Sequence, residues 1–136
     1  MLSSHTMRVF VLALTLLVAQ TPKFNPTGTW EAETGSRFQI NVKGSDVTIK
    51  LVPGSNQKYV RYDVSMTNDR DPNSYKGSGT FVAKMDSGKE CKFDTEWRIA
   101  VVAPERIVGV ATNIFADSKT CEIKEKKMMP LDLKKK

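Results

Sequence analysis

The sequence predicts an all-β protein, a small antiparallel up-and-down β-barrel of about eight strands, with a two-sheet β-sandwich as the alternative. Three observations predict this class. Apolar and polar residues alternate with period two over nearly all of the chain after about residue 20. Short segments rich in Gly, Pro, Asn, Asp and Ser separate the alternating stretches, and no 3.6-residue apolar pattern appears among them. Eight meandering strands close naturally into a barrel, which removes the exposed edges of a sheet.

Residues 1–20 have the features of a secretory signal peptide. A short polar start with Arg8 precedes the apolar run VFVLALTLLVA, which is too short to cross a bilayer comfortably. Cleavage after Ala19, Gln20 or Thr21 would fit the residues that follow, and an uncleaved N-terminal anchor is the alternative. We therefore expect an exported protein, secreted or periplasmic, with no stable membrane anchor after cleavage.

A single β-barrel domain is expected over residues 21–130, followed by a basic C-terminal tail over residues 131–136, with a short extra strand in MMPLDLKKK (128–136) as the alternative. Gly44-Ser45 has the composition of a two-residue hairpin turn. The other links are expected at 53–56, 68–74, 86–90, 104–105 and 113–118. The expected strands are TWEAE (29–33), RFQINVK (37–43), DVTIKLV (46–52), KYVRYDVSMT (58–67), YKGSGTFVAKM (75–85), CKFDTEWRIAV (91–101), ERIVGVAT (105–112) and TCEIKEK (120–126).

The same alternation assigns each side chain to a face of its strand. The inward faces are almost entirely apolar, so both a filled core and an apolar ligand cavity fit them. Gly77 and Gly79 either allow a close packing partner or make room for a ligand. The inward residues that matter below are Phe38, Ile40, Val42, Val60, Tyr62, Val64, Met66, Cys91, Phe93, Thr95, Trp97, Ile99, Val101, Cys121 and Ile123; the outward ones are Tyr59, Arg61 and Asp63.

The chain has two cysteines, Cys91 and Cys121. An exported protein meets an oxidising compartment, so we expect one disulfide between them. Two buried free thiols are the alternative interpretation.

The histidine content excludes several chemistries. The single histidine, His5, lies within the expected signal peptide, so the mature chain has no imidazole. Ser-His and Cys-His nucleophile pairs and the commonest zinc ligand sets are then impossible. Acidic pairs such as Glu31 and Glu33 are expected on a wet outward face, where carboxylates are poor general acids. We expect no enzyme and no cofactor.

No metal site is expected either. Asp69-x-Asp71-x-Asn73 has the oxygen spacing of a calcium loop, but the sixth position is Ser74 and the twelfth is Thr80. A polar turn between two strands is the better interpretation of this segment.

The charge pattern argues against a nucleic-acid partner. The formal net charge is +6, and loss of Arg8 with residues 1–20 lowers it to +5. The lysines near the C-terminus are mixed with acidic residues in EIKEKK, and no aromatic residues alternate with them. A protein surface that binds single-stranded nucleic acid by base stacking needs such aromatic residues. We therefore expect these lysines to form a solvated, charged edge of a β-strand.

Gly28-Thr29-Trp30 resembles the G-x-W pattern in the first strand of calycin barrels. The calycins comprise the lipocalins, the fatty-acid-binding proteins and the avidins. GTWEAETGSRFQI is similar to the first hairpin of avidins, DTEWRI to their Thr-x-Trp strand and RIVGVATNIF to their closing strand. In lipocalins an Arg near the last strand packs over the Trp, whereas this chain has only lysines from Cys121 onwards. The ligand-binding Asp of avidins corresponds to Ala111 or a neighbour, so biotin binding is not expected.

The resemblance implies a non-catalytic binding protein that takes a small apolar ligand inside the barrel or at its mouth. Candidate ligand-binding residues are Trp30, Phe38, Tyr62, Phe81 and Trp97, with Ser36 as the one polar ligand position that survives from avidins. The alternative is an exported interaction module with a filled core, such as an enzyme inhibitor or an envelope accessory protein, which acts on a protein partner through loops 68–74 and 86–90. The sequence indicates neither the ligand nor the partner nor the oligomeric state.

Overall fold

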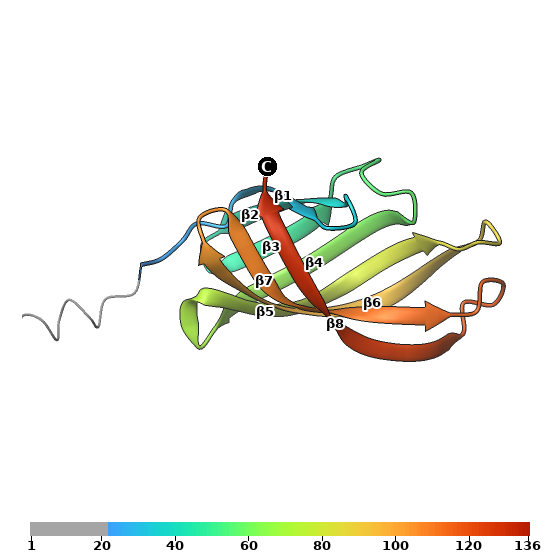
Figure 1. Cartoon of the computed structure of the whole chain (residues 1–136). Coiled ribbons are helices and arrows are strands. Elements are labelled where there is room, and N and C mark those ends of the chain that lie inside the picture. Colours follow the sequence, from blue (N-terminus) through green and yellow to red (C-terminus); the bar gives the residue numbers. More distant parts are fainter. Residues whose placement is uncertain (1–21) are drawn as a thin grey trace, which may run out of the picture.

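The computed structural model describes residues 22–136, so the expected signal peptide lies outside the described residues. Eight antiparallel strands close into one barrel in chain order, with β8 returning to pair with β1 (Figure 1). This confirms the predicted barrel over the sandwich. The strands are β1 Gly28–Ala32, β2 Arg37–Lys43, β3 Asp46–Leu51, β4 Tyr59–Asp69, β5 Asp71–Lys84, β6 Glu90–Ala103, β7 Arg106–Ala116 and β8 Ile123–Lys135.

Period-two alternation places the core where the sequence predicts it. The clearest case is β6, in which every second residue from Cys91 to Val101 is buried and the residues between them are exposed or half-buried. In the β2–β3 hairpin Lys43 pairs with Asp46, and Gly44 adopts a φ of 63° between them. Glycine occupies this left-handed region without a Cβ penalty, so the predicted two-residue turn forms.

The two strand glycines serve close packing. A Cβ on Gly79 would lie 1.8 Å from the backbone oxygen of Asp63, and one on Gly77 would lie 1.9 Å from that of Ser65. Both contacts are with the backbone of β4, which cannot move aside as a flexible side chain can. These glycines therefore let β5 coil tightly against β4, and they do not make room for a ligand.

A β-bulge changes the predicted faces at the start of β4. The register shifts between Tyr59 and Arg61, because Tyr59 pairs with Ala83 whereas Arg61 pairs with Val82. The extra residue, Val60, is 49% exposed, and Tyr59 packs against the core instead. The prediction that Val60 points inward and Tyr59 outward was wrong, because a bulge of one residue reverses the alternation on one side of it.

The expected loop at 68–74 is mostly strand. β4 and β5 meet at Arg70 alone, which adopts a φ of 65°. The carboxylate of Asp71 accepts bonds from the Asn73 backbone and the Ser74 hydroxyl, both at 2.8 Å. The Asn73 side chain accepts from Phe24 N and donates to Pro22 O, also at 2.8 Å, and so holds the N-terminal segment against the barrel. Over residues 22–136 no group of three or more His, Cys, Asp and Glu could hold a metal ion.

The C-terminal boundary differs from the expected one. The predicted tail at 131–136 belongs to β8, which runs to Lys135, and Leu133 is fully buried in the core. The tail prediction was wrong and the alternative, a strand, is confirmed, because closing the barrel supplies β1 as a pairing partner that the local sequence does not show. Ile123 and Val42, expected inward, lie at strand ends near turns and are 49% and 39% exposed.

Trp30 seals one end of the barrel. Its side chain is fully buried, and its Nε1 donates a hydrogen bond to Pro26 O at 2.8 Å. The ammonium of Lys135, which pairs with Trp30 across the β1–β8 seam, lies 5.7 Å from the ring centroid. A cation–π contact at this distance places the ammonium over the indole ring.

The opposite end, which we call the open end, is incompletely closed. It carries the β1–β2, β3–β4, β5–β6 and β7–β8 turns. β6 pairs with β7 only from Trp97 onwards, so residues 90–96 have no ladder to β7. β1 pairs with β8 only from Ala32–Leu133 to Trp30–Lys135. Two seams of the barrel therefore part towards this end.

The Cys91–Cys121 disulfide bridges the seam between β6 and the β7–β8 turn, with the two Cα atoms 5.6 Å apart. This confirms the predicted bond over two free thiols. Ser87 of the β5–β6 turn donates its backbone N–H to the Ser118 hydroxyl at 2.8 Å, which fastens the same two turns. The tip of the β7–β8 hairpin is thus held by a covalent bond where ladder hydrogen bonds are missing.

Candidate functional site

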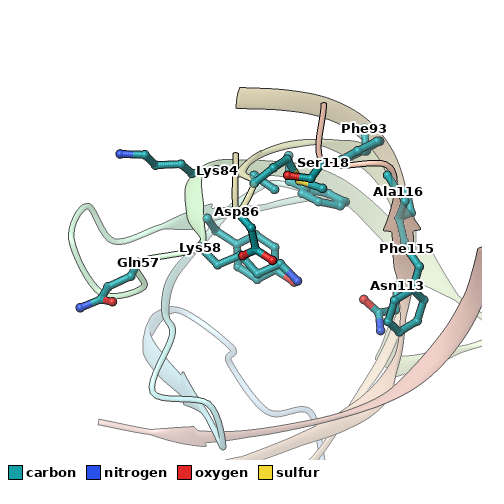
Figure 2. A pocket seen from close by; sticks show the side chains of 14 residues that line it. Gln57, Lys58, Lys84, Asp86, Phe93, Asn113, Phe115, Ala116 and Ser118 are labelled. Atoms are coloured by element: carbon teal, nitrogen blue, oxygen red, sulfur yellow. The ribbon is translucent and has the colours of Figure 1, made fainter. Parts of the chain in front are cut away.

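Two adjoining clefts enter the barrel at its open end. The first, of about 450 Å³, lies between the ends of β4, β5 and β6 and the end of β7 (Figure 2). The second, of about 430 Å³, lies where β1 and β8 part. Tyr59 and Asn113 line both clefts, so the two adjoin at the open end. We call the two clefts together the mouth.

Six aromatic rings pack together beneath the mouth. Tyr62 stacks on Phe81 with ring centroids 5.1 Å apart and planes 9° apart. The other contacts are edge-on or tilted, at 5.5–5.6 Å between centroids, which suits the ring quadrupoles. The bulge at Val60 is what brings Tyr59 into this cluster. The six rings are those of Phe38, Tyr59, Tyr62, Phe81, Phe93 and Trp97.

The polar atoms within the cluster bond to one another. Trp97 Nε1 donates to the Tyr62 hydroxyl at 3.0 Å, and the hydroxyls of Tyr62 and Thr95 are 3.2 Å apart. Burial raises the pKa of Tyr62, although the bonds from Thr95 and Trp97 act in the opposite direction, and burial also raises the pKa of Tyr59. Both phenols are therefore neutral at neutral pH, so the mouth has an uncharged, largely apolar floor.

The rim of the mouth carries the charges. Lys58, Lys84 and Asp86 line the first cleft, and Glu33 and Asp132 line the second. Asp132 is tied to Arg106 at 3.0 Å, and this bond lowers the pKa of the carboxyl. An apolar floor beneath a polar rim suits an apolar molecule whose polar end stays near water.

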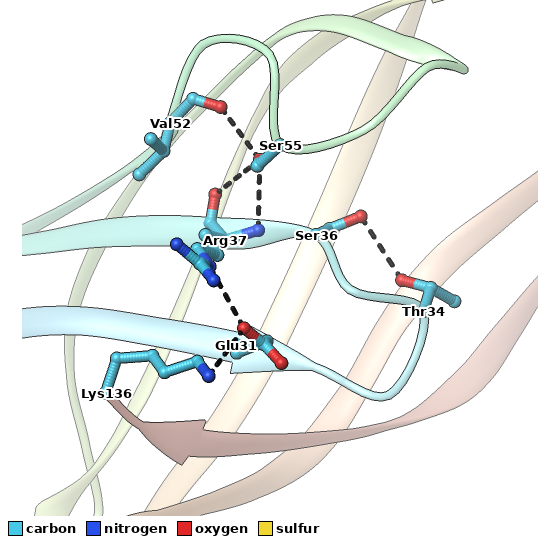
Figure 3. A network of polar contacts seen from close by, with 7 residues as sticks. All are labelled: Glu31, Thr34, Ser36, Arg37, Val52, Ser55 and Lys136. Carbon is cyan, nitrogen blue, oxygen red and sulfur yellow. Dashed lines mark hydrogen bonds and ion pairs between the residues drawn. The ribbon is translucent and has the colours of Figure 1, made fainter.

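The acidic residue of β1, Glu31, lies outside the mouth. Glu31 accepts bonds from Arg37 Nε at 3.0 Å and Lys136 Nζ at 3.1 Å (Figure 3). The bonds to Lys136 and Arg37, in that order, lower the pKa of Glu31. The carboxylate is thus ionised and paired on the outer surface, where it ties β1 to β2 and to the C-terminus.

The structure brings together most of the predicted site residues. Phe38, Tyr62 and Trp97 line the second cleft with Ser36, and Phe81 lines the first. Ser36 is buried at the rim, where its hydroxyl accepts a bond from Asn56 Nδ2 at 2.5 Å and lies 3.2 Å from the Thr34 hydroxyl.

Trp30 does not join this set. It lies at the sealed end, fully buried, and contributes to neither cleft of the mouth. The sequence shows that its side chain points inward but not at which height of the barrel it lies. Height depends on how β1 is staggered against β2 and β8, which pairing alone decides.

The predicted site residues omit several that line the mouth, among them Tyr59, Phe93 and Asn113. Tyr59 was assigned outward because nothing local marks the bulge. Phe93 was in the predicted inward set and could have been named beside Phe81, with which its ring is in contact. Asn113 was placed in a loop, whereas it lies within β7 and lines both clefts.

Within residues 22–136 no helix is long and apolar enough to cross a membrane. Comparison of the chain with protein-family models, with curated proteins and with solved structures finds no match.

Proposed function

We propose that this protein is an exported, non-catalytic binding protein of calycin-like build that takes a small apolar ligand in its mouth. The observation that carries the proposal is the six-ring cluster beneath two adjoining clefts of about 450 and 430 Å³. Clefts of this size with an aromatic floor and a few polar rim groups are typical small-molecule sites. The disulfide supports an oxidising location, which agrees with export.

The ligand would lie on the rings without a charged partner beneath it. Phe38, Tyr62 and Trp97 line the second cleft but are at most 5% exposed, so the more accessible ring of the floor is that of the half-buried Tyr59. The hydroxyl of Tyr62 is already bonded within the cluster. Ring surface of this kind favours flat or flexible apolar molecules over strongly polar ones. Lys58 and Asp86 on the rim can bond a polar end, as their position around the first cleft in Figure 2 suggests.

The test uses N-phenyl-1-naphthylamine, an uncharged apolar dye whose fluorescence rises in apolar surroundings. We expect saturable binding to the purified protein with one dye per chain. Asn113→Trp should weaken binding at least tenfold, because the new indole fills the part common to both clefts. Val102→Trp is the matched control, since Val102 is 49% exposed on β6 and lines neither cleft. Absent binding, or equal binding by both variants, would contradict the proposal.

The interaction module is the second candidate, and one observation favours it. The six rings contact one another through the middle of the barrel, so much of the inward surface is consumed by packing and not by a cavity. Of its two expected loops, residues 68–74 form strand ends, whereas 86–90 is the turn that Ser87 fastens to Ser118. Native mass spectrometry of protein from its own host separates the candidates: a retained small molecule supports the first, and a copurified protein the second.

A further inference from the structure

Most of β8 has a neighbour on one side only. It pairs with β7 from Ile123 to Lys134, but with β1 only at Leu133, Lys134 and Lys135. In Figure 1 the first half of β8 curves along the lower right of the barrel, away from β1. Among the described residues, 22–136, the stretch 123–132 therefore has no strand on its β1 side. We call this stretch the free edge.

The free edge is accessible and carries apolar side chains. Every residue from Glu122 to Pro130 is exposed, including Met128 at 42% and Met129 at 38%. A strand edge presents unpaired backbone N–H and C=O groups, which are a template for an incoming strand. Extended peptides bind many proteins by adding to such an edge, with affinity from the main chain and specificity from alternate side chains.

The β7–β8 register assigns the two faces of the free edge. Ile107 pairs with Leu133 and Ala111 with Met129, and Leu133 is fully buried, so Leu131 and Met129 face the mouth. Leu131 and Met129 line the second cleft. Lys126 lies on the opposite, outer face, because strand side chains alternate and the register stays regular from Ile107 to Phe115.

The charges of the free edge favour an acidic partner. Within residues 22–136 Lys126 makes no ion pair, and Lys124 approaches Glu122 only at 3.9 Å, with both side chains more than 60% exposed. Such an exposed pair contributes little. A carboxylate directly across from Lys126 would form a favourable cross-strand pair, whereas Lys124 lies at the register shift between β7 and β8.

We propose that the free edge binds an extended segment of a partner protein as an additional strand, with an acidic residue opposite Lys126 and apolar residues opposite Met129 and Leu131. The added strand fills the place that β1 is too short to occupy. Its apolar side chains enter the second cleft, while its backbone satisfies the free edge. This does not depend on a small ligand in the mouth.

A second copy of the chain fits the free edge less well. Two such edges in antiparallel contact about Lys126 would place lysine against lysine, and like charges directly opposite are destabilising. The observations therefore favour a different, acidic chain.

The probe is a dye-labelled ten-residue peptide that alternates glutamate and valine, measured by fluorescence anisotropy with the purified, oxidised protein. We expect saturable binding and slower amide exchange in residues 124–132. Lys124→Glu combined with Lys126→Glu should raise Kd roughly tenfold, since the favourable charge pair at Lys126 becomes repulsive and the edge beside it becomes acidic. A peptide in which the two central valines are proline should not bind, because it lacks main-chain donors.

The matched control combines Lys50→Glu with Lys92→Glu. Both lysines are exposed, on β3 and β6, and the change in net charge is the same. This control should leave Kd within twofold. The proposal is overturned if the peptide does not bind, if both charge variants weaken it equally, or if exchange slows elsewhere than at the free edge. Light scattering that shows a dimer of the free protein, with residues 124–132 protected, would assign the edge to a second copy instead.

Discussion

Removal of the Cys91–Cys121 disulfide should destabilise the protein and loosen one hairpin in particular. The perturbation is the double substitution Cys91→Ala and Cys121→Ala, compared with the oxidised and the chemically reduced parent. The bond spans the seam where β6 residues 90–96 have no ladder to β7. Without it, the tip of the β7–β8 hairpin is held to the β5–β6 turn mainly by the Ser87–Ser118 and Lys89–Lys119 hydrogen bonds, all of which are exposed.

The magnitude follows from the length of the closed loop. The two cysteines are 30 residues apart. In the chain-entropy model a loop of about 30 residues stabilises the folded state by about 3.6 kcal/mol at 25 °C. For a domain of this size the loss corresponds to a fall in Tm of roughly 10–15 °C.

Urea unfolding followed by tryptophan fluorescence measures the global loss, and amide exchange locates it. We expect exchange to rise most in residues 112–116 and 123–129, and least in β2 residues 38–40, in β3 and in β4 residues 63–67, which are hydrogen-bonded on both sides. The reduced parent should behave like the double variant, which is the control for side-chain loss at buried Cys91. A loss below about 1 kcal/mol, or an equal rise of exchange throughout the barrel, would refute the reasoning.

Three further predictions concern the backbone and the buried phenols. Gly79→Ala should lower the free energy of unfolding by at least about 3 kcal/mol or prevent folding, because the new methyl group would lie 1.8 Å from the β4 backbone. In the same urea titration, substitution of the neighbouring exposed residue, Ser78→Ala, should lower it by less than about 0.5 kcal/mol. Equal losses in the two variants would contradict the close approach of the strands. Arg70→Gly should stabilise the folded protein by about 0.5–1 kcal/mol, because φ at this single-residue link is 65° and glycine has no Cβ to clash in this left-handed conformation. A lower urea midpoint for this variant would show that the Arg70 backbone is not strained. The free energy of unfolding should fall as pH rises above about 10, because burial raises the pKa of Tyr59 and of Tyr62 in the folded state, so that only the unfolded state ionises these phenols there. Urea titrations at pH 9 and pH 11 should differ less in the variant with both tyrosines changed to Phe. An unchanged dependence on pH in that variant would exclude these two groups as the cause.

The sequence by itself determined the architecture and most of the core. Period-two alternation and short polar turns predict successive antiparallel strands, because each strand must bury one face and a short link allows only a neighbouring partner. The inward set of β6, the two-residue turn at Gly44 and the pairing of Cys91 with Cys121 all follow from such local evidence. Export, the ligand and the absence of catalysis stay predictions.

Only the tertiary structure decided where the site lies. The bulge at Val60 reverses the alternation and brings Tyr59 inward, and no residue type marks it in the sequence. Closure of β8 on β1 turns the expected tail into a strand and leaves a free edge beyond Leu133. Trp30 and Trp97 both point inward, yet one seals the barrel and the other lies beneath the mouth. The physical reason is common to all of these: local alternation fixes the face of a side chain, whereas pairing between distant strands fixes its height and its neighbours.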